Sequence, residues 1–222
     1  MKNAKKILAL LLCAVLLVGA SIAGTVAYLT DKDDVVNTFT VGKVYIELHE
    51  TDEETRENGT TGLDLHLLPG KPVAKDPTVT VNKDSENCYV RMKVTVNDTE
   101  ALTKAFEGLT YTGVHGTNVP YVVDGMFQLH LLVDGWKAEE WAFTSYNNGI
   151  YEFRYVGTEN GIVSKSAADT KLPALFESIT LPGTMTNELI KSLENVTISV
   201  TAEAIQADTF ANADAAWAAF TA

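Results

Sequence analysis

The residues that most often carry chemistry are few in this chain and widely spaced. Its four histidines, His49, His66, His115 and His130, lie in separate parts of the sequence. None belongs to the His-Glu-x-x-His pattern by which one helix face binds zinc. The Gly-x-Ser-x-Gly pattern of a nucleophilic serine and the glycine-rich phosphate loop are missing as well. The sequence therefore predicts no catalytic residue, no required cofactor and no metal ligand set, and the protein is not expected to be an enzyme.

Two weaker cation sites remain open as alternatives. His49 and His66 would bind zinc if the fold brought them together with acids of the 50–57 loop. The acidic turn Asp31–Asp34 offers carboxylates of the kind that calcium prefers. Both patterns are more typical of solvated surface residues.

Only Cys88 of the two cysteines lies in a segment that reads as folded domain. In the stretch 88–96, Cys88 falls in phase with Val90, Met92, Val94 and Val96, whereas the intervening residues are mostly polar. Alternation with a period of two indicates a half-buried strand. Cys88 is therefore expected to be a small core residue and not a nucleophile.

Similar short strands, each closed by a turn signal, recur along the chain. They are expected within 44–48, 76–82, 121–133, 175–181 and 196–203, and a hairpin is expected to join 136–143 to 150–156 around Asn147-Asn148-Gly149. Short helices are predicted at 99–106, 186–193 and 212–222. This pattern favours an all-β protein, a jelly-roll-like antiparallel β-sandwich with short helical insertions.

The first 27 residues are predicted to form a signal helix. Lys2, Lys5 and Lys6 precede an apolar run over 7–18, and small residues follow before charge returns at Asp31. That order is typical of a secretory signal peptide. We place cleavage after Thr25-Val26-Ala27, so that the exported chain begins at Tyr28 and residues 28–222 form one domain. The alternative is an uncleaved membrane anchor over 7–29.

The charge of the chain limits its partners. It holds 29 acidic and 17 basic residues, a formal net charge of −12, and the predicted signal peptide contributes only basic ones. Binding to nucleic acid requires clustered lysine and arginine. We therefore expect no nucleic-acid partner, and contact with a membrane only as the uncleaved precursor.

Several blocks of the sequence resemble the TasA/camelysin family of proteins secreted by Gram-positive bacteria. They are the stretches Gly24–Asp34 and Val36–Val44, the block Lys75–Val81, the strand Cys88–Val94 and the segment Ala202–Asp208. The likeness is strongest over about 20–96 and 196–208.

The resemblance implies processing by a SipW-type signal peptidase and a fibre-forming protein of the cell surface or biofilm matrix. It also implies donor-strand exchange, in which the N-terminal segment of one subunit completes the sheet of the next. The donor would be residues 28–41, with the anchors Val35, Val36, Phe39 and Val41. Such pairing suits an apolar, β-prone segment.

Two other functions stay open at this point. Camelysin-type relatives are catalogued as metallopeptidases, an activity for which this chain shows no zinc motif. A monomeric surface adhesin or carbohydrate-binding module would use exposed aromatic residues such as Trp136, Trp141 and Trp217.

Overall fold

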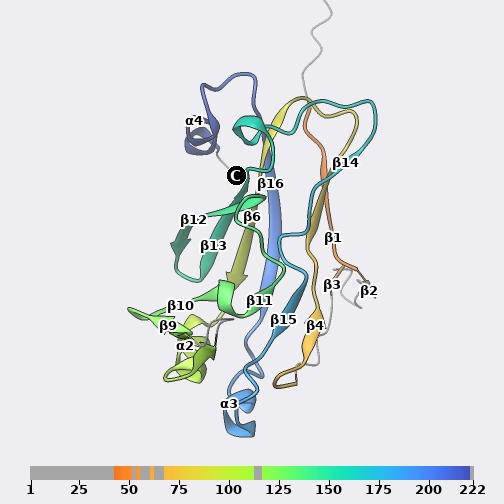
Figure 1. The fold of residues 1–222 in the computed structure, drawn as a ribbon. Helices are drawn as coiled ribbons and strands as arrows, with labels where there is room; N and C mark the ends of the chain where they lie inside the picture. Colours follow the sequence, from red (N-terminus) through yellow and green to blue (C-terminus); the bar gives the residue numbers. More distant parts are fainter. Residues whose placement is uncertain (1–42, 52–53, 56–60, 63–67, 113–116, 221–222) are drawn as a thin grey trace, which may run out of the picture. The chain divides into compact units, whose positions relative to one another are not determined.

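The computed structural model describes residues 43–51, 54–55, 61–62, 68–112 and 117–220. They belong to one compact unit over 42–222. The unit is built from short antiparallel strands with few helices, which confirms the predicted all-β class (Figure 1).

The first layer is a four-stranded antiparallel sheet with the order β12-β13-β6-β16. Its strands are β6 (Cys88–Val96), β12 (Trp141–Asn147), β13 (Ile150–Tyr155) and β16 (Ile198–Gln206). The central strand β6 follows the predicted alternation, because Cys88, Val90, Met92, Val94 and Val96 are all buried in the core.

The second layer consists of two small sheets, β1-β5-β14 and β11-β15-β4. Their strands are β1 (Ile46–His49), β4 (Pro72–Ala74), β5 (Thr78–Val81), β11 (Val133–Asp134), β14 (Thr170–Lys171) and β15 (Ser178–Thr180). Backbone bonds from Leu172 N–H to Val79 O and from Leu175 N–H to Pro77 O join segments 72–81 and 170–180 between the sheets. The two small sheets thus form one irregular layer, consistent with a sandwich.

Three two-stranded hairpins and five short helices complete the described fold. The hairpin strands are β2 (Glu54–Thr55), β3 (Thr61–Gly62), β7 (Thr110–Thr112), β8 (Asn118–Pro120), β9 (Val122–Val123) and β10 (Met126–Phe127). The helices are α2 (Thr99–Phe106), α3 (Asn187–Lys191), α4 (Ala213–Ala219) and the 3-10 turns η1 (Leu129–Leu131) and η2 (Glu159–Gly161). Helices α2, α3 and α4 confirm the three predicted helical segments, each with a side-chain N-cap.

The hairpin between β12 and β13 has the predicted turn. Asn147 pairs with Ile150, so Asn148 and Gly149 form a two-residue loop with φ values of 46° and 84°. Positive φ at both central residues defines a type I′ turn, whose twist matches that of the flanking strands.

The predicted long strand over 121–133 is wrong. The turn at Asp124-Gly125 folds the chain into the hairpin β9–β10, and a 3-10 turn follows. Leu129 and Leu132 are both buried, which a 3-10 turn with three residues per turn permits and a strand does not. The predicted strand over 175–181 is also shorter than expected, because only Ser178–Thr180 pair in a ladder.

Candidate functional site

The described histidines do not form a metal site. His49 lies exposed on β1 with its Nε2 3.2 Å from Glu47 Oε2, and His130 lies on η1. Within the described part of the chain, no three residues of the His, Cys, Asp or Glu type gather closely enough to hold a metal ion. His66, His115 and the acidic turn Asp31–Asp34 lie outside the described residues.

Cys88 is enclosed in the core and makes no disulfide. Burial raises the pKa of its thiol to about 11. A nucleophilic cysteine needs a lowered pKa and an accessible sulfur. Cys88 therefore acts as an apolar packing residue, as its strand phase predicts.

Two of the three tryptophans are also core residues. Trp141 is fully buried and donates its Nε1–H to Pro173 O at 3.0 Å, and Trp217 is 6 % exposed. Trp136 is half-buried and donates to Trp141 O at 2.8 Å. Trp141 and Trp217 are therefore core residues and do not offer the exposed aromatic surface that a carbohydrate-binding module would use.

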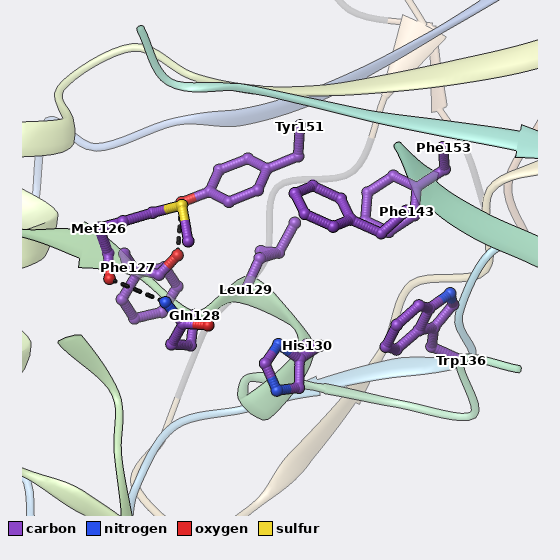
Figure 2. A pocket seen from close by; sticks show the side chains of 9 residues that line it. All are labelled: Met126, Phe127, Gln128, Leu129, His130, Trp136, Phe143, Tyr151 and Phe153. Atoms are coloured by element: carbon purple, nitrogen blue, oxygen red, sulfur yellow. Dashed lines mark hydrogen bonds between the residues drawn. The ribbon is translucent and has the colours of Figure 1, made fainter. Parts of the chain in front are cut away.

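An aromatic hollow opens beside the edge strand β12 (Figure 2). Met126, Phe127, Leu129 and His130 line one side of it, and Phe143, Tyr151 and Phe153 line the other. The cavity measures only about 40 Å³, room for little more than a water molecule or a methyl group. Tyr151 Oη donates to Phe127 O at 2.8 Å, so the phenol ties the loop to the sheet.

The hollow also lacks catalytic chemistry. Burial lowers the pKa of His130, and burial raises that of Tyr151. Both groups are thus neutral near pH 7, and no carboxylate lines the cavity to act with them. We interpret the hollow as an incompletely covered margin of the core.

A charged cluster on the outer face of the four-stranded sheet is the feature that the sequence pattern missed. Arg91 is buried, with its Nη1 3.0 Å from Glu152 Oε2 and its Nε 2.6 Å from Glu203 Oε2. The guanidinium lies 4.2 Å from the ring centre of Trp217 and 5.0 Å from that of Phe220. The ion pairs of this cluster thus join the strands β13, β6 and β16, and its cation–π contacts hold the C-terminal helix α4 on the sheet.

The edge strand β16 carries the strongest candidate for a functional site. Asn97 N–H donates to Thr197 O and Ala207 N–H donates to Asn87 O, which identifies the odd-numbered residues as those bonded to β6. In an antiparallel ladder the backbone groups of the alternate residues then point the other way. The N–H and C=O groups of Ile198, Val200, Ala202 and Ala204 thus face an edge where no strand of the described part pairs with them.

The side chains of these four residues pack against the core but are only half-buried. On β6, one strand further in, the core side chains are at most 4 % exposed. The core is therefore less well covered beneath β16.

The short strand β1 belongs to the second layer and lies next to β16 of the first layer. The Cα atoms of some β1–β16 residue pairs are within 8 Å of each other. Tyr45, just before β1, accepts from Asn82 N–H at its backbone oxygen, so the odd-numbered residues of β1 bond to β5. The backbone groups of Ile46 and Leu48 therefore point away from β5. Their side chains are half-buried against the core, as are those of β16. β1 spans four residues against the nine of β16. Much of β16 thus has no described strand opposite.

Two other edge strands among the described residues, β12 and β11, are protected. The edge strand β12 carries an irregularity in register between Phe143 and Ser145, of the β-bulge kind that disfavours pairing. The edge strand β11 is only two residues long. β16 is nine residues long, its pairing with β6 has no shift in register, and it contains no proline or lysine. An unprotected edge of this length above an apolar row of side chains is therefore a candidate site for strand pairing.

The predicted cleavage residues Thr25, Val26, Ala27 and Tyr28 lie outside the described residues, as do the predicted donor residues Val35, Val36, Phe39 and Val41. Among the helices that are described, none has the length and apolar character needed to cross a bilayer.

Comparison with known proteins returned no match: no family model, no curated protein and no solved structure corresponds to this chain. The residues themselves, above all the open edge of β16, carry the functional argument.

Proposed function

We propose that this protein is a secreted structural protein that self-assembles on the cell surface or in an extracellular matrix. Assembly would proceed by donation of the N-terminal segment, residues 28–41, to a second copy. The observation that carries the proposal is the nine-residue edge of β16, whose outward backbone groups have no described partner.

The dimensions of the two segments are compatible. A strand advances about 3.3 Å per residue, so nine residues of β16 need roughly 30 Å of partner strand. Residues 28–41 exceed that length when extended. In an extended segment Val35, Phe39 and Val41 share one face, which suits the half-buried apolar row beneath β16, and Val36 lies on the other face.

Insertion of a donor strand beside β16 requires β16 and β1 to move apart. Two strands with a third between them are roughly 9.6 Å apart, twice the usual spacing of neighbouring strands. Some Cα pairs of β1 and β16 lie within 8 Å of each other. Cleavage by a SipW-type signal peptidase after Ala27 would supply the trigger, because a tethered donor cannot reach a neighbour.

The test compares two forms of the exported protein, residues 28–222 and residues 42–222. We expect the longer form to assemble, as followed by light scattering and electron microscopy. The shorter form should keep the same circular dichroism and remain monomeric. A longer form that stays monomeric at high concentration, or a shorter form that assembles equally well, contradicts the proposal.

A further inference from the structure

A second hollow, distant in sequence from the β16 edge, lies between the hairpin β7–β8 and the strands β11 and β15. It measures about 310 Å³, within the range of small-ligand pockets. Its wall combines aromatic rings, hydroxyl groups and one carboxylate: Tyr111, Tyr121, Asp134 and Thr180.

Tyr111 offers the exposed aromatic surface of this hollow. Its side chain is 37 % exposed, and its ring stands at 89° to that of Tyr121 with the centres 6.3 Å apart. Tyr121 is held firmly, because its ring packs against Phe106 at 5.2 Å and stacks with Phe127 at 6.3 Å. A fixed ring thus supports an exposed one.

The polar groups converge from different elements. Asp134 Oδ2 accepts from Thr180 Oγ1 at 2.8 Å and from Ser178 Oγ at 3.2 Å. Its Oδ1 has no hydrogen bond or ion pair with the described residues. Burial raises the pKa of Tyr121, and Tyr111 and the Asp134 carboxylate raise it further. Tyr111, Tyr121 and Asp134 all line this one hollow.

Two glycine turns form one part of the wall. The turns at Gly70 and Gly183 meet here, with Gly70 N–H donating to Leu181 O at 2.8 Å. A Cβ atom at Gly70, where φ is +69°, would lie 3.5 Å from the Cα atom of Gly183, an ordinary packing contact. The two glycines therefore line the hollow with backbone, beside Leu181, Pro182 and Thr184.

We propose that this hollow binds one sugar unit of a neutral carbohydrate. An aromatic face covers the apolar face of a pyranose, the carboxylate accepts hydrogen bonds from sugar hydroxyls, and tyrosine and threonine hydroxyls both donate and accept. Two features disfavour an acidic carbohydrate: Asp134 has no cationic partner among the described residues, and the chain carries a net charge of −12. This inference is independent of assembly through β16.

The test is isothermal titration of residues 28–222 with hydroxyethylcellulose, laminarin, dextran and chitopentaose, and with polygalacturonic acid as the acidic counterpart. At least one neutral probe should bind, and the acidic one should not. Tyr111→Ala and Tyr121→Phe should each weaken binding roughly tenfold. The second variant removes only a hydroxyl and leaves the core ring in place.

Tyr45→Ala serves as the matched control, because Tyr45 is 48 % exposed and does not line the hollow. It should bind the same probe with unchanged affinity. The inference is overturned if no neutral probe binds, if the acidic probe binds more strongly, or if Tyr111→Ala and Tyr121→Phe bind as tightly as the wild-type protein. Binding is measured per chain, so failure here leaves the assembly proposal standing, and the converse also holds.

Discussion

Arg91 and Glu203 show how individual charged residues join the neighbouring strands β6 and β16. The carboxylate of Glu203 contacts Arg91 on one oxygen and Lys93 on the other, at 2.6 and 2.8 Å. Burial alone would raise the pKa of Glu203, but the hydrogen bonds and charges of Lys93 and Arg91 outweigh it, and the pKa is lowered. The ionised form is therefore the stabilising one.

This pKa shift predicts a specific loss of stability in acid. The folded pKa of Glu203 lies below the ordinary value of 4.5, so its contribution is fully present above pH 4.5 and is lost as the pH falls through the folded pKa. Urea unfolding of Glu203→Gln should show a weaker dependence on pH below 4.5 than the wild-type protein shows. Parallel curves for the two proteins would contradict this role.

The same cluster marks a limit of sequence reasoning. Alternation along β6 correctly predicts the buried face from Cys88 to Val96, but it also predicts a solvated opposite face. Arg91 and Tyr89 are instead buried, because α4 covers them. Nothing in local periodicity indicates that a helix more than a hundred residues later will dock there.

At the scale of elements, the β12–β13 turn depends on Gly149. A Cβ atom there would meet Val96 O at 2.6 Å and Thr99 Cγ2 at 2.7 Å, in a residue with φ of +84°. Gly125 has a similar φ of +76°, but a Cβ atom at that position would meet nothing within 4 Å.

We therefore expect Gly149→Ala to be clearly more destabilising than Gly125→Ala. The second substitution should cost about 1 kcal/mol from the backbone alone, and the first roughly 2–3 kcal/mol. Denaturant unfolding of both variants measures the difference. Equal costs would show that the contacts at Gly149 relax freely.

The two faces of the β16 backbone allow a matched pair of proline variants. In Ala202→Pro the lost N–H points away from β6, so the fold should survive and assembly should stop. In Thr201→Pro the lost N–H bonds to β6, and the cost should be about 3 kcal/mol of folding free energy.

Circular dichroism with thermal unfolding and light scattering separates these outcomes. Normal assembly by a folded Ala202→Pro protein would exclude pairing at this edge.

The elements were largely predictable where local signals agree. The strand at 88–96, the Asn148-Gly149 turn and the capped helices follow directly from alternation and turn chemistry. The segment 121–133 was not predictable: its alternating apolar residues indicate a strand, whereas the 3-10 turn buries Leu129 and Leu132 in place of alternate residues. The open edge itself is a property of sheet order, which depends on long-range pairing that no local pattern encodes.

At the scale of the whole molecule, an acidic chain, which we propose to be exported, folds into a sandwich that leaves one long edge unpaired in its described part. A high net charge keeps single chains apart in solution. Under the proposed function, directed backbone pairing at that edge would set the geometry of association, in place of non-specific apolar contact.

Amide hydrogen exchange along β16, read residue by residue by NMR in single chains and in assemblies of residues 28–222, tests this account most directly. In single chains the outward amides of Ile198, Val200, Ala202 and Ala204 should exchange rapidly, and the odd-numbered amides bonded to β6 should be protected. In assemblies the outward amides should slow by roughly tenfold or more, with little change in the others. Assemblies in which the outward amides exchange as fast as in single chains would contradict the central claim.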